Sequence, residues 1–318
     1  MLVNALLFLL GFALLIKGGD WFVDAASAIA HRFNMPELLI GATVVSIGTT
    51  LPEVMVSAQG ALAGSGAIAF GNAVGSVICN TSLIAAITLL ARPASVEKKT
   101  LILPSCAFFI AAAFYAFNAY AFGRFSRATG AVLLAMFAVY MVLIVLQMKA
   151  SPVSAQEDDE AQAPETSFAH DAVMLVIGAV VIAIGARLLV DNAQVIAAAL
   201  GVPESVIALT LVALGTSLPE LVTAITALIK GLGALSLGNI IGANLFNLVL
   251  VSGVATVISP FDLSSASATS LSVDIPLMLF VMLVMTLPAL ITGKLRRWQG
   301  AVLICAYAGY CAFQFFVA

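Results

Sequence analysis

Two glutamates of this chain lie inside long apolar stretches and have nearly identical surroundings. Glu53 ends the segment GTTLPE, and Glu220 ends the segment GTSLPE. Each follows a pair of hydroxyl residues, namely Thr49, Thr50, Thr216 and Ser217. If the stretches cross a bilayer, such ionisable side chains are costly and are functional by default. Carboxylate and hydroxyl oxygens suit Ca²⁺ or Na⁺ better than zinc or copper. The pattern therefore predicts a cation-binding site built on both glutamates.

Further oxygen-bearing side chains recur at helical spacing around the two glutamates. Ser46, Thr49 or Thr50, and Glu53 share one helix face, because they follow positions i, i+3 or i+4, and i+7. The next segment adds residues at i, i+4 and i+8, which are Asn72, Ser76 and Asn80. The corresponding polar residues of the second half are Thr210, Thr216, Ser217, Glu220, Asn239 and Asn247.

The distances along the chain place these groups at one depth. Glu53 stands eleven residues before the turn at 64–66, which corresponds to ~16 Å of helix. Ser76 and Asn80 stand ten and fourteen residues beyond that turn. All three side chains are therefore expected near the middle of a hydrocarbon core ~30 Å thick. In the second half, the same count of residues on either side of the turn places Glu220, Ala243 and Asn247 at one depth.

A proline precedes each glutamate. Pro52 and Pro219 are expected to kink their helices, because proline cannot donate to the carbonyl four residues earlier. The carbonyls freed in this way belong to Gly48 and Gly215. Irregular backbone at membrane depth is tolerated where it lines a cavity. We therefore expect the Gly48 and Gly215 carbonyls to lack their helical hydrogen bonds and to lie beside the carboxylates and hydroxyls.

The composition defines the class of protein. The chain has 318 residues, of which 62% are hydrophobic and 9% are charged, and the mean hydropathy is +1.14. Soluble domains are closer to half apolar and a quarter charged. With 13 basic against 16 acidic side chains, there is no basic excess for nucleic acid. These values exclude a soluble enzyme, a disordered protein and a nucleic-acid binder, and they predict a polytopic membrane protein.

The expected fold class is all-α, with ten transmembrane helices. Ten apolar stretches are separable, each near the ~20 residues that span a bilayer. They lie near 2–24, 37–62, 68–90, 100–120, 128–148, 170–190, 203–229, 235–257, 271–290 and 298–317.

The chain repeats itself at an offset of 167 residues. PELLIGATVVSIGTTLPE at 36–53 corresponds to PESVIALTLVALGTSLPE at 203–220, and GNAVGSVICN at 71–80 corresponds to GNIIGANLFN at 238–247. A fixed offset over this length indicates duplication. Each half holds five stretches, an odd number, so the second half is expected to be inverted. Inverted repeats are typical of secondary transporters that bind substrate near the midplane.

The repeat sets the expected domain boundaries. The first five-helix repeat covers 1–148 with its motif at 41–80, and the second covers 170–318 with its motif at 208–247. A linker at 149–169 holds five of the sixteen carboxylates and has no apolar periodicity. With both termini outside, nine Lys and Arg residues fall at cytoplasmic ends against two outside. The positive-inside rule therefore predicts a cytosolic linker and external termini.

Some of these residues have simpler structural explanations. Serine and threonine in membrane helices often bond their own i−4 carbonyl, and a single buried glutamate could be a protonated structural residue. Two glutamates in equivalent contexts argue against that second explanation. Asp20, Asp24 and Asp191 lie near helix ends and are expected to be interfacial.

These motifs resemble those of the cation/calcium exchanger superfamily, and within it those of the sodium/calcium exchanger family. GTTLPE with GNAVGSVICN and GTSLPE with GNIIGANLFN match its two α-repeats. The chain looks closest to bacterial calcium/sodium antiporters with a short central linker. The resemblance implies ten helices, alternating access and Na⁺/Ca²⁺ exchange. It also implies that the first and sixth helices slide against the other eight.

The resemblance further implies a set of ion ligands. In the first half these are Thr49, Thr50, Glu53, Ser76, Asn80 and the Ser46 carbonyl. In the second half they are Thr216, Ser217, Glu220, Asn247 and the Ala213 carbonyl. The chain departs from the family pattern at Val77, where Asn is usual, at Ala243, where Ser is frequent, and at Asn247, where many members have Asp.

Other functions remain open at this point. Ca²⁺/H⁺ exchange or K⁺-dependent Na⁺/Ca²⁺ exchange would use similar groups, although Asn247 removes one titratable side chain. An intramembrane protease would pair aspartates rather than glutamates, and a channel would show a ring of pore loops. We expect a non-enzymatic carrier without cofactor, whose substrates are Ca²⁺ and Na⁺. It is expected to act as a monomer in the inner cell membrane, in contact with lipid and not with nucleic acid.

Overall fold

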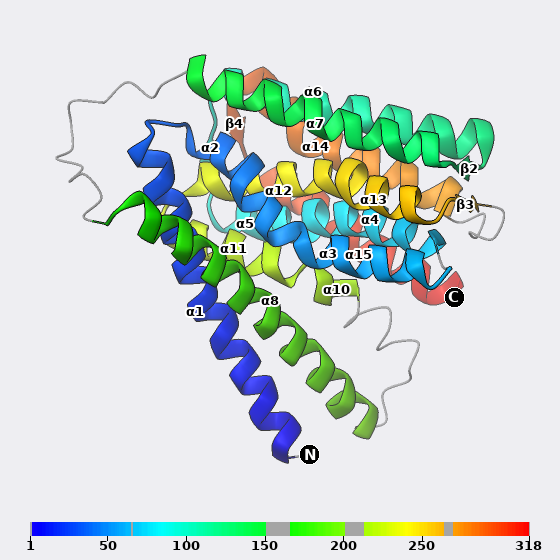
Figure 1. Ribbon diagram of the computed structural model, residues 1–318, viewed down its shortest axis with the longest axis horizontal. Helices are drawn as coiled ribbons and strands as arrows, with labels where there is room; N and C mark the ends of the chain where they lie inside the picture. Colours follow the sequence, from blue (N-terminus) through cyan, green and yellow to red (C-terminus); the bar gives the residue numbers. More distant parts are fainter. Residues whose placement is uncertain (1, 65, 151–165, 201–212, 264–269, 318) are drawn as a thin grey trace.

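The computed structural model describes residues 2–64, 66–150, 166–200, 213–263 and 270–317. These residues form long helices that pack side by side (Figure 1). The part of the expected linker at 151–165 and the start of the seventh expected stretch lie outside the described residues.

The helices of the first half follow the expected apolar stretches. They are α1 (Leu2–Arg32), α2 (Glu37–Ile40), α3 (Ser46–Leu62), α4 (Gly66–Cys79), α5 (Ala86–Ala91), α6 (Lys98–Phe117) and α7 (Arg127–Ala150). Wider π-helical turns join α2 to α3 (η1, Gly41–Val45) and α4 to α5 (η2, Asn80–Ala85), and a third turn ends α6 (η3, Asn118–Phe122).

The second half has the same kind of organisation. Its helices are α8 (Phe168–Ala199), α10 (Ala213–Thr216), α11 (Leu218–Ile229), α12 (Gly233–Phe246), α13 (Ser252–Ile258), α14 (Ile275–Thr292) and α15 (Arg297–Val317). Its π-helical turns are η5 (Asn247–Val251) and η7 (Ser270–Asp274).

The expected polytopic all-α fold is confirmed. Within the described ranges, eight helical segments are long and apolar enough to cross a membrane. The expected stretch at 203–229 is represented by α10 and α11, and the stretch at 298–317 by α15. Two expected boundaries were too short, because α1 continues to Arg32 and α8 continues to Ala199. Neither helix meets a proline or a glycine turn before those ends, so the backbone hydrogen bonding continues.

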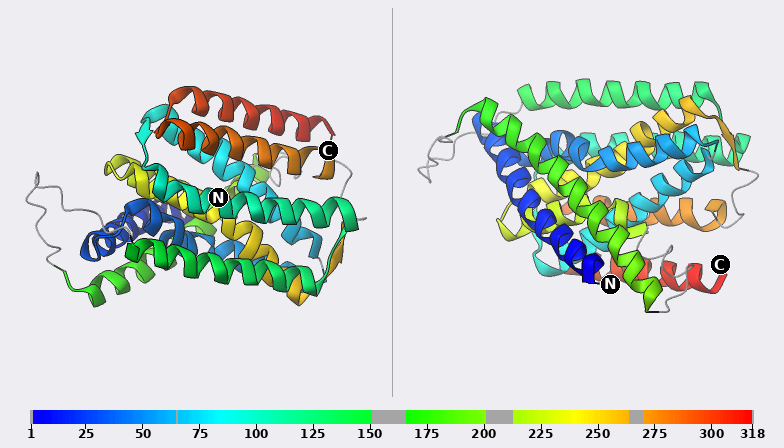
Figure 2. Two further views of the ribbon diagram at one scale, coloured as in Figure 1. Left: turned by 90° about the horizontal axis from the view of Figure 1, so that it is seen from above. Right: turned by 60° about the horizontal axis from the view of Figure 1, so that its bottom comes forward.

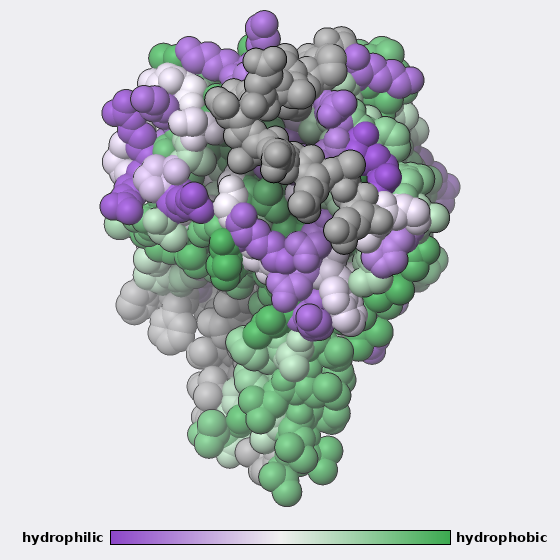
Figure 3. Space-filling model, turned by 90° about the vertical axis from the view of Figure 1, so that its left-hand side faces the viewer, coloured by the Kyte–Doolittle hydropathy of each residue, from purple (hydrophilic) through white to green (hydrophobic). Residues whose placement is uncertain are grey.

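Helices α1 and α8 form an antiparallel pair at the edge of the molecule. A Cβ on Gly11 would lie 2.8 Å from the carbonyl oxygen of Gly185, and one on Gly178 would lie 2.8 Å from the backbone nitrogen of Phe22. Glycines thus let the two backbones touch. Figure 1 shows the pair leaning away from the other helices, and the right view of Figure 2 shows its two helices side by side. Figure 3 shows that its protruding end is apolar.

Ion pairs hold one end of α1. Arg32 contacts Asp171 of α8 at 3.0 Å, and Lys230 at the end of α11 contacts Asp24 at 2.7 Å and Asp20 at 3.4 Å. The partly exposed Lys230 pairs contribute little stability, up to about 1 kcal/mol, so they fix orientation more than they stabilise. Figure 3 faces this end of the molecule and shows hydrophilic residues gathered there.

Helix α12 forms the centre of the bundle. Its membrane-length segment is 83% buried, whereas those of α1 and α8 are 22% buried. It crosses α2 and η1 at glycines: a Cβ on Gly41 would lie 2.8 Å from the Asn239 nitrogen, and one on Gly242 would lie 2.7 Å from Ala42 Cα. This close crossing brings the two motif segments into direct contact.

Two short antiparallel strand pairs connect the halves. β1 (Ala94–Ser95) pairs with β4 (Lys294–Leu295), and β2 (Arg124–Phe125) pairs with β3 (Phe261–Asp262). Each pair joins a strand of the first half to a strand of the second half. β1 and β3 are also equivalent in the repeat, because β3 lies 167 residues after β1.

The tight crossing predicts a stability effect. In Gly238→Ala the new Cβ would overlap the Leu38 carbonyl and lie 3.0 Å from the Ala42 nitrogen. Overpacking of this kind costs about 1–3 kcal/mol, so the unfolding temperature in detergent should fall. As a control, Gly309→Ala on α15 meets no described atom within 4 Å. It should be neutral or slightly stabilising, because alanine favours helix by about 1 kcal/mol. Equal unfolding temperatures for the two variants would contradict the crossing.

Candidate functional site

The two sequence-predicted glutamates lie together in the interior. Glu53 of α3 and Glu220 of α11 are each 0% exposed, and they are close enough for their charges to interact. Helix α3 packs directly on α11. None of the four carboxylate oxygens has a hydrogen-bond partner among the described residues. Like charges in such surroundings require a compensating cation or proton.

The two prolines act differently from one another. Pro52 lies inside α3, which continues past it to Leu62. At Pro219 the helix is broken rather than kinked, because Ser217 leaves helical geometry with φ −90° and ψ 4°, and α11 starts at Leu218. Glu220 therefore stands in the first turn of α11, where the helix end carries partial positive charge.

The hydroxyls of the first motif bond across to α12. Thr49 Oγ1 donates to the side-chain oxygen of Asn239 at 3.1 Å. Ser46 Oγ lies 2.7 Å from the Gly41 carbonyl and 2.9 Å from the Asn239 carbonyl. By contrast, Thr43 bonds only carbonyls within its own helix, at 2.7 Å to Leu39 and 3.4 Å to Ile40. A bond to a carbonyl of the same helical rod therefore accounts for the Thr43 hydroxyl, whereas the Thr49 hydroxyl contacts a residue from the second half of the chain.

Both predicted asparagines begin π-helical turns. η2 starts at Asn80 and η5 starts at Asn247. Both side chains are 0% exposed, and neither atom of either amide has a partner among the described residues. π-helical turns occur frequently at functional sites, because the extra residue redirects side chains. The 167-residue offset between the asparagines means that both halves use the same local device.

Partnerless buried polar atoms concentrate on the predicted ligands. Buried polar groups in proteins are normally hydrogen-bonded, and an unpaired one costs about 1–3 kcal/mol. Six sequence-predicted ligands have such atoms, namely Thr50, Glu53, Asn80, Ser217, Glu220 and Asn247. Oxygen atoms in this number suit coordination of a hard cation. Among the described residues, no three or more His, Cys, Asp or Glu side chains are grouped so that they could hold a metal ion, so the candidate donors are mostly neutral.

The contacts between elements bring these ligands towards one another. α11 packs on η2, while η5 packs on α3 and α4. Ser217 and Glu220 lie near Cys79, which immediately precedes Asn80. Glu220 also lies near Thr49 of α3. These contacts place the first-motif and second-motif residues in one region of the interior.

The remaining predicted residues are placed less completely. Ser76 is buried on α4, one turn before Asn80, and Thr216 ends α10. Ala213 begins α10, and the role of its carbonyl stays a prediction. Thr210 lies outside the described residues. Asp191 is 62% exposed and lies 3.6 Å from Arg187, and its expected interfacial position stays a prediction.

Helices α1 and α8 cover the glutamate helices through contacts that the sequence did not reveal. A Cβ on Gly48 would lie 2.7 Å from the Phe22 ring of α1, and one on Gly215 would lie 2.8 Å from a methyl group of Val190 on α8. Gly48 and Gly215 are equivalent in the repeat. Each helix of the edge pair therefore rests against one motif glycine, a contact that no sequence spacing signals.

Asn239 is a second residue whose role the sequence left unassigned. Its amide oxygen accepts from Thr49 at 3.1 Å and lies 3.4 Å from Ser46 Oγ. Its equivalent, Asn72, instead donates to Ser57 Oγ at 2.9 Å. The only signal was its spacing of eight residues before Asn247.

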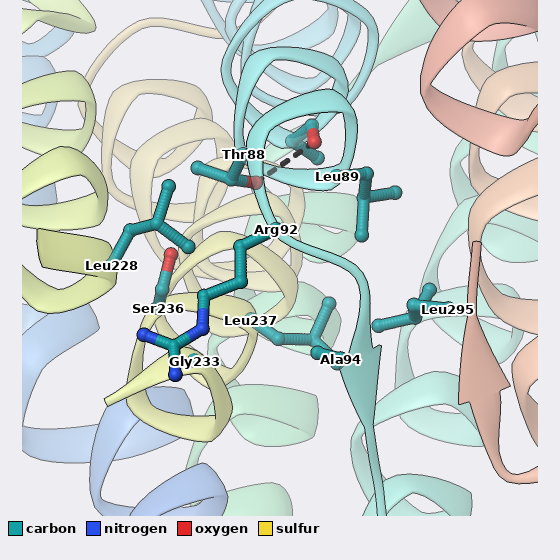
Figure 4. A pocket seen from close by; sticks show the side chains of 10 residues that line it. Thr88, Leu89, Arg92, Ala94, Leu228, Gly233, Ser236, Leu237 and Leu295 are labelled. Carbon is teal, nitrogen blue, oxygen red and sulfur yellow. Dashed lines mark hydrogen bonds between the residues drawn. The ribbon is translucent and has the colours of Figure 1, made fainter. Parts of the chain in front are cut away.

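A surface pocket lies apart from this site. Figure 4 shows it between Arg92, Leu228, Ser236 and Leu295. None of the predicted ion ligands lines it. The two glutamates, which are each 0% exposed, therefore lie apart from this pocket.

Comparisons with known proteins agree with the motifs. A family model described as sodium/calcium exchanger protein matches residues 3–146 and 170–316. The putative antiporter CaxA of Alkalimonas amylolytica is 38% identical, with 98% of each chain covered. The sodium/calcium exchanger MaX1 of Methanosarcina acetivorans is 32% identical, with 99% of each covered. The solved structure of the sodium–calcium exchanger NCX_Mj, soaked with Na⁺ and no Ca²⁺, is 33% identical, covers 98% of each chain and has a TM-score of 0.80.

The geometry predicts that a divalent cation stabilises the folded protein. Saturating Ca²⁺ should raise the unfolding temperature in detergent, since a ligand at 100 times its Kd contributes about 2.7 kcal/mol. Glu53→Gln combined with Glu220→Gln should abolish that increase, because the site loses both negative charges. Asp191→Asn, which neutralises a 62% exposed carboxylate, should retain it. A full Ca²⁺ effect in the double variant would contradict the site.

Proposed function

The chain belongs to the sodium/calcium exchanger family, and from this membership we propose how its buried site performs exchange. It is a multi-pass membrane protein that exchanges Na⁺ and Ca²⁺, and it is a transporter rather than an enzyme. The two ions are its substrates, and no cofactor takes part. The observation that carries the proposal is the pair Glu53 and Glu220, buried together without hydrogen-bond partners among the described residues.

The proposed architecture is two inverted five-helix repeats, 1–148 and 170–318, joined by the linker 149–169. The family model supports these boundaries, because it matches the two halves separately. Two further features recur at the 167-residue offset. Gly64 and Gly231 both have left-handed backbone, with φ of 80° and 81°, and η2 and η5 both start at an asparagine. Equivalent turns in both halves are expected of a duplicated fold.

The proposed ion ligands are oxygens from both halves. Glu53 and Glu220 supply the charge, and the neutral oxygens come from Ser46, Thr49, Thr50, Ser76, Asn80, Ala213, Thr216, Ser217 and Asn247. Ser46 and Ala213 contribute through their carbonyls. The partnerless atoms of six of these residues support the assignment, as does the packing of α3 on α11.

Charge balance accounts for the exchange. The two ionised glutamates give the site a formal charge of −2, which one Ca²⁺ or two Na⁺ neutralise. A third Na⁺ would leave the loaded carrier at +1 and make transport electrogenic. Because both ions need the same oxygens, they exclude one another. An uncompensated charge crosses an apolar barrier at high cost, so the carrier changes access readily only when the site is loaded.

The pair α1 and α8 is proposed as the moving part. These helices contact each other closely and are the least buried spans. Phe22 of α1 packs on Gly48, and Val190 of α8 packs on Gly215. Sliding the pair would therefore cover one glutamate helix while it uncovers the other. This arrangement would open the site to one side of the membrane at a time.

The proposed location is the inner cell membrane, with both termini outside and the linker in the cytosol. Basic residues gather at the linker end, where Arg32 pairs with Asp171 and Lys230 pairs with Asp24. This distribution supports a cytosolic face at that end. We also propose that the monomer is functional, because one chain carries both repeats and both glutamates.

Removal of one carboxylate should stop exchange. In proteoliposomes, Glu53→Gln and Glu220→Gln should each abolish Ca²⁺ uptake driven by a Na⁺ gradient, because one Ca²⁺ is no longer neutralised. Asp191→Asn should transport normally. Near-normal flux in either glutamine variant would refute the site. Varying Na⁺, K⁺ and pH separately in the same vesicles distinguishes Na⁺/Ca²⁺ exchange from proton-coupled or K⁺-dependent exchange.

Asn247 provides a second test. Asn247→Asp adds a third carboxylate beside Glu53 and Glu220, so the empty site becomes more negative and harder to ionise fully. The Na⁺ dependence or the pH dependence of Ca²⁺ flux should therefore change. Glu37→Gln, at a helix start away from the two glutamates, serves as a control. Identical ion and pH dependence in Asn247→Asp and the wild type would show that Asn247 does not line the site.

A further inference from the structure

A buried hydrogen-bonded group of three residues joins the two halves beside the proposed ion site. The side-chain amide of Asn244 donates to Thr81 Oγ1 at 2.7 Å and to Met282 Sδ at 3.2 Å. The Thr81 hydroxyl in turn donates to the same sulfur at 3.3 Å. All three side chains are 0% exposed. They come from η2, α12 and α14, which are three separate rods of the bundle.

The bonds leave this group little freedom. The Thr81 proton is directed at the methionine sulfur, which accepts only weakly, so the hydroxyl oxygen remains free to accept from the amide. The surrounding cluster is apolar and includes Val77, Ile78 and Leu245. Because a polar group buried there has few alternative partners, rotation of the Asn244 side chain would break both of its bonds.

This group is next to residues of both halves of the site. Thr81 directly follows Asn80 in η2. Asn244 precedes Asn247 by three residues, and α12 leads straight into η5. The Asn244–Thr81 bond therefore connects the backbone that carries Asn80 to the backbone that carries Asn247. It fixes how far apart the ligands of the two halves stand.

The repeat contains no second copy of this bond. At the 167-residue offset, Thr81 corresponds to Leu248 and Asn244 corresponds to Val77. Both of those side chains are 0% exposed and belong to the main apolar cluster. The turn η5 is held in another way, because Ser252 Oγ donates to the Asn247 carbonyl at 3.1 Å. The polar connection is thus a specific feature of one side of the site.

We propose that Asn244 is a positioning residue that sets the spacing of the ion ligands and so selects among divalent cations by size. The inference rests on the proposed function, because it takes Asn80 and Asn247 as ligands. Discrimination between cations depends on cavity size and on ligand flexibility. Residues that orient metal ligands typically change metal affinity about 10–100-fold when removed. Ca²⁺ and Sr²⁺ carry the same charge and differ in radius, so the ratio of the concentrations at which they act on the carrier reports the spacing of the ligands.

The test measures Ca²⁺ uptake driven by a Na⁺ gradient and its inhibition by Sr²⁺. Full-length protein in proteoliposomes gives a half-saturating Ca²⁺ concentration and a half-inhibitory Sr²⁺ concentration. Their ratio does not depend on how much of the protein is active. Thr81→Val removes the hydroxyl and keeps the shape of the side chain. Leu248→Val is the matched control, because it places valine after the other site asparagine and breaks no hydrogen bond.

We expect Thr81→Val and Asn244→Leu each to raise the half-saturating Ca²⁺ concentration by about tenfold. Each should also move the Sr²⁺/Ca²⁺ ratio towards one, because ligands that are free to move discriminate less by size. The double variant should change the ratio no further than Asn244→Leu alone, since both substitutions remove the same bond. Leu248→Val should keep the wild-type ratio.

A purely structural role would give a different result. The positioning role would be overturned if the variants had lower maximal rates but an unchanged half-saturating Ca²⁺ concentration and an unchanged Sr²⁺/Ca²⁺ ratio. It would also be overturned if the wild type itself had an Sr²⁺/Ca²⁺ ratio of one. If the Asn244→Leu protein does not fold, the result for Thr81→Val alone decides the positioning role, because that substitution preserves the shape of the side chain. Absence of Na⁺-driven Ca²⁺ uptake by the wild type would overturn the proposed function instead.

Discussion

Two carboxylates that share one dry interior repel each other, and each is deprived of the water that would stabilise its charge. Glu53 and Glu220 are in this situation, because both are fully buried and their charges interact. Such a pair is tolerable only when cations or protons compensate it. In the proposed function, the dependence of the pair on a bound cation links ion binding to stability and ion loading to movement through the membrane.

The fold delivers the two glutamates from opposite halves of a duplicated chain. Glycine crossings bring α12 into backbone contact with α2 and η1, and the π-helical turns at Asn80 and Asn247 redirect amides at equivalent points. The halves are nevertheless not identical in their bonds. Thr49 reaches Asn239 across the interface, and Asn244 reaches Thr81. The repeated motifs supply the proposed ligands, while these bonds are found on one side only among the described residues.

Much of the fold and of the site could be predicted from the sequence, for identifiable reasons. A carboxylate inside an apolar stretch is conspicuous wherever it occurs, so Glu53 and Glu220 needed no structure to be singled out. The helix lengths were harder, because a helix that continues along its partner, as α1 does to Arg32, has no stop signal in its composition. The break at Ser217 was also missed, since the same proline motif leaves α3 continuous.

The sequence by itself determined the chemistry: an apolar chain, a 167-residue repeat and one carboxylate with hydroxyls in each copy. These follow from residue type and from spacing along the chain, which are local properties. Only the tertiary structure decided that Phe22 and Val190 cover the motif glycines, that Asn239 holds Thr49, and that Asn244 binds Thr81 and Met282. Those contacts join residues far apart in the chain, and their geometry arises only when the helices pack.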